Sequence, residues 1–162
     1  MSGNVYVDAA LFLGMNSADE SVRIACKSFF AARLFGRVVM SLEQIGRCDD
    51  LVWRFPRTVQ DAYYPFMDNL HTDMRIERRG YDETDMRLGL MIELDGLAMH
   101  ERLLAAMVLN GDGVLWSVSP RLLAHRSLPV RPPETDGELL FPEALERLYC
   151  TSLALRVPIA EL

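Results

Sequence analysis

The stretch VYVDAALFLG occupies residues 5–14 and sets the fold of the chain. Residues 5–7 favour a short β-strand, and the apolar residues 9–14 continue as a turn or a short helix. Asp8 stands at the junction between them. In α/β sheets, ligands bind beyond the carboxyl ends of the strands. The stretch therefore predicts a first strand that delivers Asp8 to a site at the carboxyl edge of the sheet.

A second strand–helix unit follows the first. Ser17, with Glu20 three residues later, predicts the start of an amphipathic helix. Residues 38–40 form a buried, β-prone run, and Ser41 with Gln44 predicts the cap of the next helix. Strands that alternate with helices of this length favour a mainly parallel sheet covered on both faces. The expected fold class is therefore α/β.

The rest of the chain continues this alternation. An aromatic stretch, residues 55–73, is interpreted as one helix and a lid-like loop. Beyond it the patterns predict a half-exposed strand, two helices, a buried strand, a surface loop, a helix and a last strand, at residues 74–78, 84–92, 97–109, 113–118, 129–137, 142–150 and 153–157.

Length and composition are those of an ordinary globular protein. The 162 residues suit one domain, and a 50% hydrophobic and 25% charged composition gives no reason to expect disorder. No apolar run approaches the roughly 20 residues of a membrane span, and residues 1–4 lack the pattern of a signal peptide. We therefore expect a cytoplasmic protein with no membrane partner. Its basic residues are arginines apart from Lys27, a bias typical of high-GC genomes such as those of actinobacteria.

The net charge and the cysteine pattern argue against certain ligands and cross-links. A net charge of −6 argues against broad binding to a phosphate backbone, so RNA is a less favoured partner than a small molecule. Cys26, Cys48 and Cys150 are scattered without a CxxC pair, so they indicate neither a disulfide framework nor a zinc ribbon.

Three segments together carry a family resemblance. Residues 5–11, the strand and cap at 38–41, and residues 103–117 with Gly111 resemble a PIN-like domain. The resemblance covers about residues 4–125 and leaves 126–162 as an extension with a helix and a strand. It implies a three-layer α/β/α sandwich. It also implies a metal-dependent ribonuclease in which three or four carboxylates hold Mg²⁺ or Mn²⁺, and many such proteins are toxins of toxin–antitoxin pairs.

The family's acidic positions are only partly acidic here. Asp8 matches the first acid, whereas Gly46, His100 and Ser119 stand at the other three positions. Glu43, one helical turn before Gly46, is expected to reach the site in its place, and Asp50 lies on the same helix face. The resemblance therefore implies an altered metal site.

The candidate site residues follow from these positions. We expect Asp8, Glu43, His100 and Ser119 to be catalytic, and Tyr63, Tyr64 and Arg47 to bind substrate. Asp8, Glu43 and His100 are candidate ligands for Mg²⁺ or Mn²⁺, or for Zn²⁺ or Fe²⁺ if the imidazole ligates. A site without any metal, in which His100 and a carboxylate exchange protons, is the alternative. Asp8 as a simple helix cap and His100 as an ordinary surface histidine are the structural alternatives.

Three functions remain open on the sequence. The first is acid–base chemistry on a small carbonyl-type molecule, a condensation or hydrolysis in bacterial specialised metabolism. The second is a Mg²⁺- or Mn²⁺-dependent ribonuclease, of the general or the toxin type, with Asp8, Glu43 and either Asp95 or Glu101 as ligands. The third is a non-catalytic interaction module. A homodimer is one expected assembly.

Overall fold

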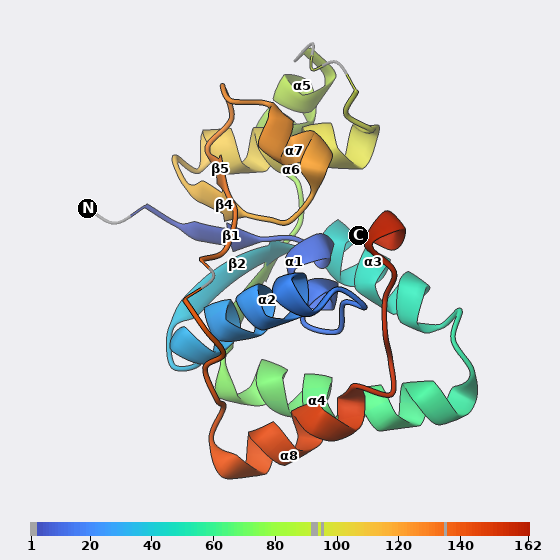
Figure 1. Ribbon diagram of the computed structural model, residues 1–162. Helices are drawn as coiled ribbons and strands as arrows, with labels where there is room; N and C mark the ends of the chain where they lie inside the picture. Colours follow the sequence, from blue (N-terminus) through green and yellow to red (C-terminus); the bar gives the residue numbers. More distant parts are fainter. Residues whose placement is uncertain (1–2, 92–93, 95, 135) are drawn as a thin grey trace.

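The structure is a computed structural model that describes residues 3–91, 94, 96–134 and 136–162. Its described residues form a five-stranded sheet in the order β3-β2-β1-β4-β5, and each pairing is parallel (Figure 1). The strands are β1 (Val5–Val7), β2 (Arg37–Ser41), β3 (Arg75–Arg79), β4 (Val114–Trp116) and β5 (Val130–Arg131). The predicted parallel sheet is confirmed, with β1 at its centre.

Helices cover both faces of this sheet. They are α1 (Ala9–Gly14), α2 (Glu20–Ala32), α3 (Leu42–Val52), α4 (Arg57–Asp73), α5 (Glu83–Met91), α6 (Met99–Asn110), α7 (Pro120–Ala124) and α8 (Glu143–Ser152), with a 3₁₀ turn η1 (Ile159–Glu161). Figure 1 shows α5, α6 and α7 on one side and α1, α2, α4 and α8 on the other. One apolar core fills each side. The three-layer α/β/α fold class is thus confirmed.

The centre of the sheet is tightly packed where β1 meets β4. Tyr6 is fully buried, and its ring lies against Gly113, which precedes β4. A methyl group added at Gly113 would approach the Tyr6 ring to 2.4 Å and the Asn4 carbonyl oxygen to 2.6 Å. Glycine is needed there because the strand and the ring leave no room for a side chain.

Replacing Gly113 with alanine is therefore expected to lower the free energy of unfolding by about 2 kcal/mol, since the backbone of Asn4 cannot move aside cheaply. Gly46, inside α3, is the matched control, because an added Cβ meets no atom within 4 Å. Gly46→Ala should leave stability unchanged or raise it by about 0.5–1 kcal/mol. Urea denaturation of both variants measures the contrast, and equal effects would contradict the packing argument.

Two predicted helix caps have different outcomes. Ser41 caps α3 as expected, because its hydroxyl accepts a hydrogen bond from Gln44 N. The cap predicted at Ser17 is wrong: Asp19 caps α2, with its carboxylate accepting from Val22 N. Ser17 instead accepts from Asp19 N and so supports the true cap. Asp is as good an N-cap as Ser, and here the turn geometry decided between them.

The aromatic stretch contains no lid-like loop. Residues 57–73 form one continuous helix, α4, which packs against α8. Its buried face, with Tyr63 and Phe66, is part of the core, and this burial holds the helix together through Pro65. The patterns also missed the short helix α7 and strand β5.

The last predicted strand, residues 153–157, is also wrong. Only an isolated bridge links Val157 to Ser17, with Ala18 N donating to Val157 O at 2.8 Å. Asn16 fastens the same segment by donating to the Ser152 and Leu155 carbonyls. These hydrogen bonds hold residues 152–157 against residues 16–18. Figure 1 shows the red C-terminal turn close to α1 and α3.

Candidate acid–base site

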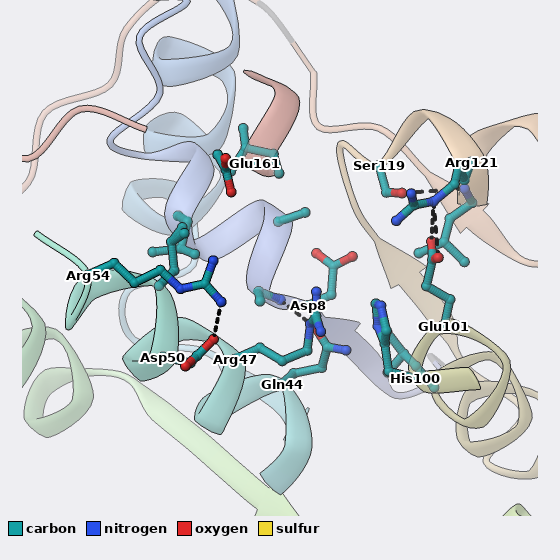
Figure 2. Close-up of a pocket in the computed structure, with 17 residues that line it drawn as sticks. Asp8, Gln44, Arg47, Asp50, Arg54, His100, Glu101, Ser119, Arg121 and Glu161 are labelled. Carbon is teal, nitrogen blue, oxygen red and sulfur yellow. Dashed lines mark hydrogen bonds and ion pairs between the residues drawn. The ribbon is translucent and has the colours of Figure 1, made fainter. Parts of the chain in front are cut away.

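A pocket of about 140 Å³ opens at the carboxyl edge of the sheet, where β1 leads into α1 (Figure 2). Residues of the helices α1, α3, α6 and α7, or of the positions that cap them, line most of this pocket. Glu161 and Leu162 close one side. The polar lining includes Asp8, Gln44, Arg47, His100, Glu101, Ser119 and Arg121. The predicted position of the site, beyond β1, is where this pocket lies.

Asp8 is one of two buried acids of the pocket. It is 3% exposed and caps α1, with Oδ1 accepting from Leu11 N at 2.8 Å. Its other oxygen accepts from the Ser117 hydroxyl. Burial raises the pKa of Asp8 from 3.8 to about 6, although these two hydrogen bonds work in the opposite direction and the charge of Glu101 adds to the rise. Asp8 is therefore both a helix cap and an acid that titrates near neutrality.

His100 enters the pocket from the first turn of α6. Burial lowers the pKa of His100, and the positive charge of Arg47 lowers it further, against the weaker effects of Glu101 and Glu43. The Nδ1 atom is buried and has no hydrogen-bond partner among the described residues. A buried polar atom without a hydrogen-bond partner is uncommon in folded proteins, and a catalytic role is one reason for it.

Glu101 is a second buried carboxylate, 3% exposed, next to His100 in sequence. Oε1 accepts from Ala98 N, so the side chain caps α6 from its third helical residue. Arg121 of α7 binds the same carboxylate, with Nε 3.0 Å from Oε1 and 3.3 Å from Oε2. Figure 2 draws this pair beside Ser119. The carboxylate is thus fixed by an arginine and a backbone amide.

The helix α3 presents Gln44 and Arg47 to the pocket, one turn apart. Gln44 is buried, and its Oε1 accepts from Ala9 N at 2.9 Å, which ties α3 to the start of α1. Arg47 is exposed, and no ion pair joins it to another residue in the described part of the chain. It is thus a cation free to meet an anionic ligand.

Of the predicted site residues, the structure brings together Asp8, Arg47, His100 and Ser119. Ser119 caps α7 by accepting from Leu122 N, so its position has a structural reason as well. Glu43 is not brought to the pocket lining. It is exposed, and its carboxylate accepts from the Tyr81 hydroxyl, because the residue of α3 that faces Asp8 is Gln44.

The two tyrosines expected to bind substrate also lie elsewhere. Tyr63 is 2% exposed and belongs to the apolar core on the α4 side. Tyr64 donates its hydroxyl to Asp49 at 3.0 Å. Neither lines the pocket, because residues 57–73 form a helix on the face of the sheet and not a loop over its edge. Asp95, an alternative ligand, lies outside the described residues.

Sequence patterns missed Gln44 and Arg121 as pocket residues, and gave Glu101 only as an alternative. Gln44 follows Ser41 by three residues, a spacing that places both on the side of α3 that meets the sheet edge. The sequence comparison placed His100 at the acid position, one residue before Glu101. One residue rotates a helix by about 100°, so a shift of one position decides which side chain is buried. Arg121 was interpreted as a surface charge, because α7, the helix that brings it to the pocket, was not predicted.

The donor set does not fit a resident divalent metal. No group of three or more His, Cys, Asp and Glu side chains among the described residues is arranged to hold one. Of the four carboxylates that line the pocket, the two buried ones already have partners: a backbone amide and a hydroxyl for Asp8, a backbone amide and Arg121 for Glu101. Mg²⁺ demands near-ideal octahedral oxygen ligation, which these engaged atoms do not offer. The predicted ligand set Asp8, Glu43 and His100 is not assembled.

One protein-family model matches the whole sequence. Residues 1–162 match a family of unknown function, DUF6190. The chain belongs to this family. No curated protein matches the sequence.

Solved structures support the fold. The chain is similar to VapBC2 from Rickettsia felis, solved bound to a DNA fragment from their promoter, with a TM-score of 0.57 and 11% identity over 80% of this chain and 98% of that one. It is also similar to PAE2754 from Pyrobaculum aerophilum, with a TM-score of 0.53 and 16% identity over 91% of this chain and 90% of that one. The fold is PIN-like, as the sequence resemblance implied. In the described residues no helix is long and apolar enough to cross a bilayer.

Proposed function

We propose that this PIN-like protein cleaves RNA by acid–base catalysis, without a resident metal ion. The observation that carries the proposal is the pairing of Asp8 and His100 in one pocket, with the pKa of the acid raised to about 6 and that of the imidazole lowered. Groups whose pKa values lie close to the working pH are the ones that transfer protons efficiently. Perturbed groups in a cleft are candidates for function for that reason.

RNA suits such a site because it carries its own nucleophile. His100, neutral, takes the proton from the ribose 2′-hydroxyl, and the 2′ oxygen forms a bond to phosphorus. The bond from phosphorus to the 5′ oxygen breaks, and protonated Asp8 gives its proton to that leaving oxygen. The products are a 2′,3′-cyclic phosphate and a 5′-hydroxyl, so atoms and charge balance without a metal or a cofactor. A base, an acid and a cation suffice.

Arg47 supplies the cation in this proposal. It lacks a carboxylate partner among the described residues and lies one turn from Gln44, at the pocket. A guanidinium binds phosphate oxygens through two parallel hydrogen bonds, which suits the charge that develops on phosphorus. The net charge of −6 still disfavours extended backbone binding, so we expect contact with only a short stretch of RNA.

The test is cleavage of a labelled single-stranded RNA in the presence of EDTA. We expect cyclic phosphate products from the wild type, and a loss of rate of about 10²–10⁴-fold in Asp8→Asn and in His100→Ala. The rate should fall above the Asp8 pKa of about 6, as the acid loses its proton, and fall again at lower pH as His100 becomes protonated. Arg126→Ala, an exposed arginine outside the pocket, is the control and should keep full activity.

Two outcomes would overturn the proposal. Cleavage that EDTA abolishes and Mn²⁺ restores would indicate a metal-dependent nuclease. RNA that stays intact would favour the second candidate, acid–base chemistry on a small carbonyl-type molecule. The pocket volume of about 140 Å³, suited to few ligand atoms, is the observation that favours this alternative. A panel of small aldehydes and esters, tested with the same two variants, would then measure it.

A further inference from the structure

The ion pair between Arg121 and Glu101 indicates a role for Arg121 that the proposed reaction does not include. Glu101 is 3% exposed, whereas the Arg121 side chain is 58% exposed and reaches inward from α7 to meet it. A buried carboxylate needs a counter-charge, because an unpaired charge in the interior is costly. Arg121 is the only cation paired with Glu101 among the ion pairs that the described residues form.

The same guanidinium also controls what else can bind there. Its Nε lies within 3.3 Å of both oxygens of Glu101, and one of these oxygens also accepts from Ala98 N. A divalent cation at this carboxylate would have to displace Arg121 and would then face the positive charge of the displaced side chain. Asp8 is the other buried carboxylate that lines this pocket, and the charge of Glu101 contributes to the raised pKa of Asp8.

We propose that Arg121 is a built-in cation that takes the place of a metal ion and keeps divalent metals out of the pocket. It neutralises Glu101, holds it away from metal ligation and so determines that the site works without metal. The role follows from the mismatch between the donor set and a metal, and it stands whether the substrate is RNA or a small molecule. Removing Arg121 should free Glu101 and, with Asp8, create a site of two carboxylates that suits Mn²⁺ or Mg²⁺.

Binding of Mn²⁺ to the full chain, followed by electron paramagnetic resonance, tests this inference without an activity assay. We expect the wild type to bind no Mn²⁺ at concentrations up to about 1 mM, whereas Arg121→Gln binds it at least roughly tenfold more tightly. Arg121→Lys keeps the positive charge and should still exclude the ion. Arg126→Gln, an arginine outside the pocket, should behave as the wild type.

A double variant assigns the new site. Arg121→Gln combined with Glu101→Gln should lose the gained Mn²⁺ binding, because the freed carboxylate is gone. Circular dichroism confirms that each variant is folded. The inference is overturned if the wild type binds Mn²⁺ below about 1 mM and Asp8→Asn abolishes that binding, or if folded Arg121→Gln gains none. If Arg121→Gln does not fold, Mn²⁺ binding by the wild type that Asp8→Asn abolishes still overturns the inference.

Discussion

Replacing Asp8 with asparagine is expected to stabilise the protein while it removes activity. Burial holds the Asp8 pKa at about 6 rather than 3.8, so the ionised carboxylate destabilises the folded state at neutral pH. A shift of about two pKa units corresponds to roughly 3 kcal/mol. Asparagine keeps the oxygen that accepts from Leu11 N and carries no charge. We expect a gain of about 1–3 kcal/mol in the free energy of unfolding at neutral pH.

The difference in the free energy of unfolding between the wild type and Asp8→Asn should depend on pH. Because the folded-state pKa is the higher one, the folded protein binds the proton more tightly than the unfolded chain. The contribution of Asp8 to stability is fully present below 3.8 and is lost as the pH rises through about 6. The wild type and Asp8→Asn should therefore differ little in acid, and the difference should grow across this window and then level off.

Denaturant unfolding of both proteins at pH values on either side of the window measures the effect. Asp68→Asn, at an exposed position of α4, is the control and should show no such pH-dependent difference. A destabilised Asp8→Asn at neutral pH would mean that the cap and the Ser117 hydrogen bond outweigh the buried charge. Asp8 would then have only a structural role. Stabilisation with lost activity is the pattern expected of a functional residue.

Replacing Lys27 with methionine is expected to have the opposite effect on stability. Lys27, on α2, is fully buried, with Nζ 2.6 Å from Glu146 and 3.0 Å from Glu138. The ammonium also lies 4.8 Å from the centre of the Tyr149 ring. Methionine fills a similar volume but leaves Glu146 without its cation. We expect a loss of about 3 kcal/mol in the free energy of unfolding, the low end for a broken buried pair, because both glutamates reach solvent.

Lys27→Met should lower the stability of one region more than that of the rest of the protein. Lys27 fastens the segment around Glu138 and α8 to α2, so the C-terminal part should open first in Lys27→Met. Urea denaturation and limited proteolysis measure the two effects. Arg147→Met removes a surface ion pair with Glu143 on the same helix and should change neither. Unchanged stability in Lys27→Met would show that the buried cluster contributes no net free energy.

Much of the fold could be predicted from local patterns. β1, β2, β3 and β4 and most helices coincide with predicted segments to within a few residues. The lid-like loop was wrong because α4 depends on burial against α8, a contact remote in sequence. β5 was missed because two residues next to prolines carry little β signal, and only pairing with β4 makes them a strand.

The candidate site was predictable only in part. Its position followed from Asp8 at the end of β1, since parallel strands bring their carboxyl ends to one edge. The identity of the residues that line it did not follow from the sequence. Glu43 and Gln44 are neighbours in the sequence, yet the turn of α3 exposes one and buries the other against Ala9.

The sequence by itself determined a parallel α/β sheet, the place of Asp8 and the scarcity of acids around it, because strand and helix periods and residue chemistry are local properties. Only the tertiary structure decided that His100 shares a pocket with Asp8 and that Arg121 neutralises Glu101. Burial, which moves the pKa of Asp8 to about 6, also arises only when distant elements exclude water from the same carboxyl group. The chemistry that we propose for the site depends on these three facts.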